Sequence, residues 1–112
     1  MNKQSKVYIV CEPTHRIAGE RIRAVDLSPA AEYGEPIILL KSTSSLIDSQ
    51  PLVETLCERL ATFCDDDWLV PIGEPALMCI AAMVAASMNK GRVKFLKWDR
   101  QLSRYIPIKV YV

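Results

Sequence analysis

Residues 36–98 alternate between short apolar runs and helical patterns, and this alternation constrains the fold more than any other feature. Three of its runs are apolar enough to predict strands: 36–41, 68–72 and 92–98. Two segments between them have start signals and apolar spacing that predict helices: 51–64 and 75–88. Units of this kind place successive strands parallel in one sheet, with right-handed crossovers.

The rest of the chain adds strands on both sides of this βαβαβ middle. Residues 6–11 predict a first strand, and 105–112 predict a last strand that forms an antiparallel hairpin with 92–98. Between residues 11 and 36 we expect three pieces: a loop at 13–20, a short strand at 21–26 and one or two helical turns at 28–34.

A chain of 112 residues suits one hydrophobic core, so we predict a single domain over residues 1–112. The predicted class is α/β, with a mixed, mainly parallel sheet and a C-terminal antiparallel hairpin. A three-layer arrangement is the first choice, and a two-layer α+β sandwich is the alternative.

The predicted helix 75–88 has no charged side chain between residues 76 and 86. A helix that is apolar on every side is either fully buried or covered by a partner, and a small domain has little material to bury it. We therefore predict a homo-oligomer, in the simplest case a homodimer, that buries part of helix 75–88.

Charge is distributed unevenly although the whole chain carries only +1. Residues 90–112 hold seven Lys or Arg and one Asp, whereas residues 48–74 hold seven acidic residues and one Arg. Alternation along the last strand separates Ile106, Ile108 and Val110 from the side chains of the opposite face. The predicted partner-binding or nucleic-acid-binding residues are Arg92, Lys94, Lys97, Arg100, Arg104, Tyr105, Lys109 and Tyr111.

Basic and aromatic side chains on one solvent-facing surface suit single-stranded nucleic acid, which binds through phosphate contacts and base stacking. Two other interpretations stay open. Edge strands carry Lys, Arg and Pro to prevent aggregation, and a basic surface also suits a protein partner with an acidic face.

A second candidate site is a phosphate site at the ends of two predicted strands. Ser42, Thr43 and Ser44 follow one of these strands, and Gly73 follows the other just before a helix begins. Such ends form a crevice in open α/β sheets, and helix N-termini favour anions. Neither GxGxxG nor the P-loop pattern is present, and ordinary turns explain both segments equally well.

Residues able to perform catalysis or bind metals are too dispersed for a recognisable site. His15 is the only histidine, and no acid lies at a spacing that would orient it. The four cysteines form no CxxC pair, which favours reduced thiols over zinc ligands or disulfides. The consecutive Asp65, Asp66 and Asp67 suit a solvated turn better than a calcium loop. We expect no metal, no cofactor and no catalytic residue, which favours a binding protein over an enzyme.

The chain resembles small uncharacterised proteins encoded by bacteriophages. The resemblance rests on three segments: 96–100 (LKWDR), 104–108 (RYIPI) and 26–35 (DLSPAAEYGE). It implies a phage origin and a place inside a bacterial host, and it transfers no functional residue. No apolar run reaches the ~20 residues needed to span a membrane, and the N-terminal one is too short for a secretory signal, so we expect a cytoplasmic protein.

Three functions remain open at this point. The first is a small non-enzymatic binding or accessory protein that acts through its basic, aromatic hairpin. The second is a nucleotide- or phosphate-binding α/β domain, and the third is a structural component of a phage particle.

Overall fold

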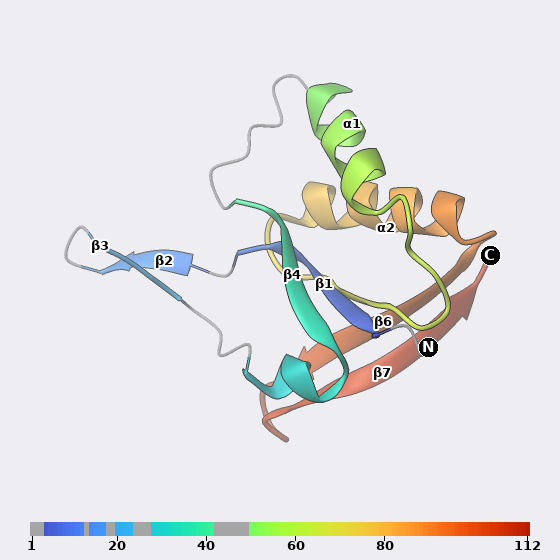
Figure 1. The fold of residues 1–112 in the computed structure, drawn as a ribbon. Helices are drawn as coiled ribbons and strands as arrows, with labels where there is room; N and C mark the ends of the chain where they lie inside the picture. The colour runs from blue at the N-terminus through green and yellow to red at the C-terminus, as the bar shows by residue number, and fades with distance from the viewer. Residues whose placement is uncertain (1–3, 13, 18–19, 24–27, 42–49) are drawn as a thin grey trace.

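A five-stranded sheet forms the centre of the molecule (Figure 1). The computed structural model describes residues 4–12, 14–17, 20–23, 28–41 and 50–112. The strands of this sheet are β1 (Lys6–Cys11), β4 (Glu35–Leu40), β5 (Trp68–Val70), β6 (Arg92–Asp99) and β7 (Arg104–Tyr111). Their order across the sheet is β4-β1-β5-β6-β7.

The pairing confirms the predicted α/β class. β1 pairs in parallel with β4 and with β5, and β5 pairs in parallel with β6. β7 then runs antiparallel to β6, as the predicted hairpin requires. Tyr8 of β1 lies between Ile37 of β4 and Leu69 of β5, so β1 has a parallel neighbour on each side, as β5 does.

Both α helices pack on one face of this sheet. Helix α1 (Gln50–Arg59) buries Leu52 and Leu56, and α2 (Pro75–Met88) buries Leu77, among others, against the same core. Helix α1 is also tied to the sheet by Arg59, whose guanidinium donates to the carbonyl of Leu39. This helical face contains the larger of the two hydrophobic cores.

The opposite face of the sheet is covered by the 3-10 helix η1 (Ser28–Glu32), which packs Ala30 against β1 and β7 residues (Figure 1). The chain moves one way along the sheet from β1 to β4 and the other way from β4 to β5 and β6. Right-handed crossovers then place η1 and the α helices on opposite faces. The predicted third layer is therefore one short 3-10 helix in the described part of the chain.

The structure differs from the sequence prediction between β1 and η1. Residues 13–20 were expected to form a loop, but Thr14–Ile17 forms strand β2, which pairs antiparallel with β3 (Glu20–Arg23). Figure 1 shows this hairpin extending away from the main sheet. Strand β3 overlaps the short strand predicted at 21–26, whereas β2 was not predicted, because a four-residue strand resembles a loop when read along the chain.

The predicted helix 75–88 is confirmed, but its side chains are unequally exposed. Leu77, Ala81 and Val84 are buried against the sheet, together with Ala85. On the outer side Met83 is 72% exposed and Cys79 is exposed. No described helix is both long and apolar enough to cross a membrane.

Candidate binding surface on the β6–β7 hairpin

The register of the hairpin brings four of the predicted residues to one face. Arg92 lies opposite Tyr111, and Lys94 lies opposite Lys109. Directly opposed residues of antiparallel strands point to the same side of a sheet. That side is the face opposite α1 and α2, because the alternate residues Val93 and Phe95 pack into the helical core. We call Arg92, Lys94, Lys109 and Tyr111 the hairpin surface.

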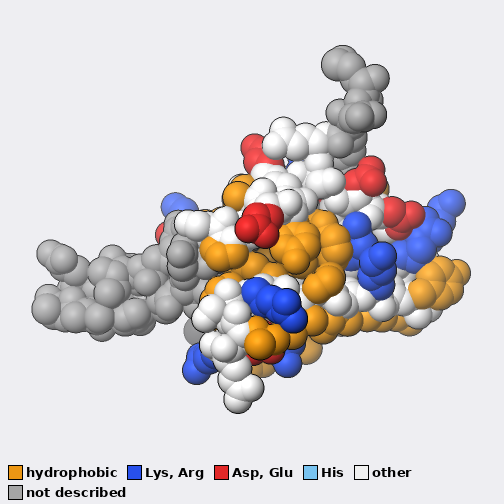
Figure 2. Space-filling view, turned by 90° about the horizontal axis from the view of Figure 1, so that it is seen from below, with side chains coloured by type: hydrophobic (Ala, Val, Ile, Leu, Met, Phe, Trp, Pro, Cys, Tyr) orange, Lys and Arg blue, Asp and Glu red, His pale blue; other side chains and the backbone are white. Residues whose placement is uncertain are grey.

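An open cavity of about 370 Å³ lies where this surface meets the C-terminal end of α2 and the connection from α1 to β5. All four hairpin-surface residues line it, together with Cys64, Asp65, Asn89, Val93 and Val110. Figure 2 shows the side of the molecule away from the α helices, where Lys and Arg side chains lie beside a band of hydrophobic side chains. The volume is near the lower end of the range for small-molecule sites, ~300–1,000 Å³.

Trp68, an aromatic residue that was not predicted from the sequence, packs against the hairpin surface at Lys94. The Lys94 ammonium lies 4.0 Å from the centre of the Trp68 ring, which is a cation–π contact. Trp68 in turn meets Tyr33 edge to face at 5.3 Å. The strand 68–70 is only three residues long, so its alternation was too short to show which face Trp68 would take.

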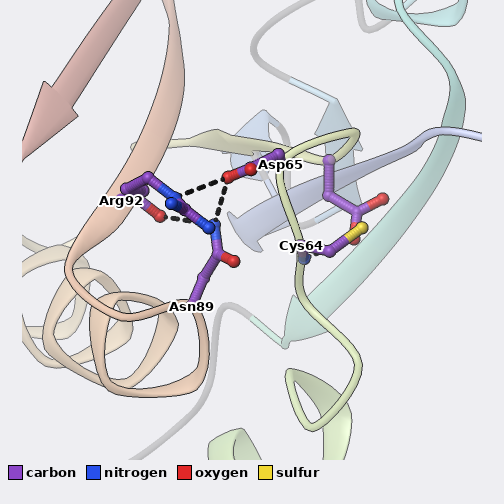
Figure 3. A network of polar contacts seen from close by, with 5 residues as sticks. Cys64, Asp65, Asn89 and Arg92 are labelled. Atoms are coloured by element: carbon purple, nitrogen blue, oxygen red, sulfur yellow. Dashed lines mark hydrogen bonds and ion pairs between the residues drawn. The ribbon is translucent and has the colours of Figure 1, made fainter.

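A polar network positions Arg92 at the rim of the cavity (Figure 3). The Asp65 carboxylate accepts from Asn89 Nδ2 at 2.9 Å and from Arg92 Nε at 3.1 Å. Asn89 Nδ2 also donates to the Arg92 carbonyl at 2.9 Å. The hydrogen bond from Asn89, followed by the charge and hydrogen bond of Arg92, lowers the pKa of Asp65. An exposed pair of this kind adds little stability, so its main effect is to orient the guanidinium.

The other predicted binding residues lie elsewhere. Lys97 is exposed but pairs with Ile106, so it points to the helical face of the hairpin. Arg100 is exposed in the turn between β6 and β7. Arg104 lines a second cavity of about 470 Å³ near η1, with Pro29, Glu32, Tyr33, Ser103, Tyr105, Ile106 and Pro107.

The expectation that Tyr105 faces solvent is wrong. Tyr105 is only 3% exposed and meets Trp98 edge to face at 5.0 Å. It belongs to the core under η1, whose Ala30 is part of the same cluster. Tyr105 and Tyr111 share one strand face, but η1 covers only the Tyr105 end.

The candidate anion site is only partly described. Ser42, Thr43 and Ser44 lie outside the described residues. Gly73 lies just before Glu74, the N-cap of α2. The Glu74 carboxylate accepts from Ala76 N at 2.7 Å and from Leu77 N at 3.2 Å. A protein carboxylate therefore uses the N–H groups that a bound phosphate would need at this helix end.

The three consecutive aspartates have different environments. Asp65 belongs to the network at the cavity, Asp66 is exposed, and Asp67 is fully buried. Asp67 accepts from Lys6 N at 3.1 Å and from Cys64 N at 3.0 Å, which ties the α1–β5 connection to β1. Among the residues described, no three His, Cys, Asp or Glu side chains are grouped as metal ligands would be.

The four cysteines form no disulfide and lie in unequal environments. Cys11 is buried, and this burial raises its pKa, with a backbone hydrogen bond from Glu74 acting in the opposite direction. Cys79 is exposed on α2, while Cys57 and Cys64 are half-buried.

We expect alkylation by iodoacetamide at neutral pH to modify Cys79 first and Cys11 last. The thiolate is the reactive form, and Cys11 combines a raised pKa with little access for the reagent. Mass spectrometry of peptides after timed labelling measures the order. Labelling in urea is the control, because unfolding should make the four rates similar. Early modification of Cys11 in the folded protein would contradict the expected order.

A comparison with known protein families matches this chain. The model of a family described as phage Pam3 gp32-like protein matches residues 5–112. No curated protein and no solved structure matches the chain. The match spans nearly the whole sequence and confirms the predicted resemblance to bacteriophage-encoded proteins.

Proposed function

We propose that this chain, which belongs to the phage Pam3 gp32-like protein family, is a non-enzymatic accessory protein that binds single-stranded nucleic acid on its hairpin surface. The observation that carries the proposal is the convergence of Arg92, Lys94, Lys109 and Tyr111 on one open cavity. Three cations and an exposed aromatic ring are the groups that bind a phosphate backbone and stack on a base.

Each part of the cavity suits a different part of a nucleotide. Lys94 and Lys109 lie directly opposite each other and offer two ammonium groups to neighbouring phosphates. Tyr111 is 76% exposed, so its ring can accept a base without being uncovered first. Asp65 offsets one of the three positive charges, so we expect modest affinity that falls with added salt.

The other functions are less well supported by the described residues. A phosphate site before α2 competes with the Glu74 carboxylate for the same N–H groups. Edge protection accounts for the lysines and Pro107 but not for a cavity that collects three cations beside an exposed tyrosine. A structural place in the phage particle is compatible with family membership, and co-purification of the protein with virions would favour it.

Titration of the protein with short single-stranded oligonucleotides at low salt tests the proposal. We expect Lys109→Glu to weaken binding about tenfold at low salt, because the variant loses one phosphate contact. The slope of log K against log salt concentration should become shallower by about 0.7. Tyr111→Ala should weaken binding by about 1–3 kcal/mol per stacked base and leave the salt slope nearly unchanged. Fluorescence anisotropy over a range of salt concentrations measures both effects.

Lys97→Glu is the matched control. It makes the same charge change on the same hairpin, but Lys97 points to the opposite face. Equal losses for Lys97→Glu and Lys109→Glu would mean that net charge and not the hairpin surface governs binding. Absence of binding by the wild type at low salt would remove the nucleic-acid proposal and leave a protein partner as the next candidate.

A further inference from the structure

The C-terminal half of β7, together with Val112 directly after it, exposes apolar side chains at the edge of the sheet. Six large hydrophobic side chains of the described residues are exposed, and four of them belong to this segment. Their exposed fractions are 40% for Ile108, 38% for Val110, 76% for Tyr111 and 87% for Val112. By contrast, α2 has one exposed large hydrophobic side chain, Met83. An apolar patch of this kind marks an interaction surface.

The same segment also offers main-chain hydrogen-bonding groups. In the described part of the chain, β6 is the only strand that pairs with β7. Val112 N donates to the Gly91 carbonyl at 2.8 Å, which places even-numbered residues of β7 in the hydrogen-bonded positions toward β6. The N–H and C=O groups of Lys109 and Tyr111 therefore point outward, away from β6.

Pro107 limits which part of this edge can pair. Pro107 lies opposite Leu96 and, like Lys109 and Tyr111, directs its main-chain groups away from β6. Because proline has no N–H, its nitrogen supplies no hydrogen-bond donor on the free edge. The edge is thus blocked at Pro107 and open at Lys109 and Tyr111. A pairing partner must use the end of the strand that also carries the exposed apolar side chains.

We propose that this end of β7 pairs antiparallel with the same segment of a second copy of the chain. The fitting register places Val110 opposite Val110 of the second copy at a twofold axis, with Lys109 opposite Tyr111 and Ile108 opposite Val112. On one face the apolar side chains cover one another, and on the other each lysine lies beside a tyrosine ring. Both copies keep Pro107 outside the paired region.

The chemistry of the edge selects a second copy over an unrelated strand. Lys109 meets an aromatic ring and not another lysine in this register, whereas a shift that centres Lys109 on the axis sets two like charges opposite each other. That shift also places Pro107 opposite Tyr111 of the second copy. Proline has no N–H, so one main-chain hydrogen bond of this pair could not form. The segment is therefore self-complementary in one register, as a twofold interface requires.

Pairing through β7 would join two hairpin surfaces into one. Lys109 and Tyr111 line the cavity of each copy and would meet across the axis. The sheet would then continue through both molecules with the two cavities on the same side. This interface differs from the α2 interface that the sequence predicts, and one experiment compares them.

Sedimentation velocity over a concentration series tests the proposal. We expect the wild type to form a dimer and Val110→Lys to remain monomeric, because the variant sets two charges at the axis. Met83→Glu, on the exposed side of α2, should leave the dimer intact. A monomeric wild type at the highest concentration, or dissociation by Met83→Glu and not by Val110→Lys, would overturn the proposal.

A cysteine pair tests the register without relying on loss of association. In a Cys79→Ser background, Val110→Cys should form an intermolecular disulfide on mild oxidation. Position 110 would form a non-hydrogen-bonded pair across the axis, and the Cα atoms of such a pair lie about 4.5 Å apart. Ile108→Cys is the matched control and should not cross-link, since residue 112 lies opposite it. Efficient cross-linking through position 108 but not 110 would contradict the register.

Discussion

Asp67→Ala is expected to lower the free energy of unfolding by about 3–6 kcal/mol, because it removes two hydrogen bonds to a charged acceptor, which contribute about 1.5–3 kcal/mol each. Asp67 is fully buried, and its two carboxylate oxygens accept the N–H groups of Lys6 and Cys64. These bonds connect the start of β1 with the α1–β5 turn. Alanine would leave both N–H groups without this acceptor, in a part of the structure with limited access to water.

Urea denaturation measures this effect as a lower midpoint with an unchanged slope. The exposed neighbour supplies the control, since Asp66→Ala should change stability by no more than about 0.5 kcal/mol. Asp67→Asn should fall between the two, because an amide keeps one oxygen acceptor. If Asp67→Ala were as stable as the wild type, the turn would not depend on these hydrogen bonds.

Gly73→Ala should destabilise the protein by about 2–6 kcal/mol, the sum of backbone strain and overpacking at about 1–3 kcal/mol each. Gly73 has φ +121°, a conformation that residues with a Cβ rarely adopt. A Cβ at this position would lie 2.6 Å from Cys11 Cβ and 2.7 Å from Cys11 Sγ. The same junction is held by Cys11 N, which donates to the Ile72 carbonyl at 3.2 Å.

A double-mutant cycle separates the two causes. Cys11→Gly removes the side-chain atoms that an alanine at position 73 would meet, so the double variant should lose less stability than the sum of the single ones. The loss that remains measures backbone strain at Gly73. Strict additivity would mean that the contact with Cys11 contributes nothing and that strain alone opposes the alanine.

The four residues of the hairpin surface could be placed on one face from the sequence. Alternation along 92–98 and 105–112 was enough to pair Arg92, Lys94, Lys109 and Tyr111 on one face, because opposed residues of a hairpin share a side by geometry. The helical turns at 28–34 and the helix 75–88 were likewise marked by local signals, Gly34 and the Glu74–Pro75 start among them. Short-range patterns of this kind need no knowledge of distant segments.

Other parts of the site depend on segments far apart in the chain. Tyr105 has the same alternation as Tyr111, yet η1 covers the first and leaves the second exposed. Trp68 meets Lys94 only because β5 is placed beside β6. Strand β2, and with it the β2–β3 hairpin, was missed because a four-residue strand is too short to stand out from a loop.

The division between sequence and tertiary structure follows the range of the forces involved. Periodicity, caps and turn residues act over a few positions, so the α/β order, the parallel strands and the basic face of the hairpin could be inferred from the sequence alone. Burial is a property of what packs against a residue. The tertiary structure therefore decided which faces α1, α2 and η1 cover, why Asp67 is buried beside the exposed Asp66, and which end of β7 remains open.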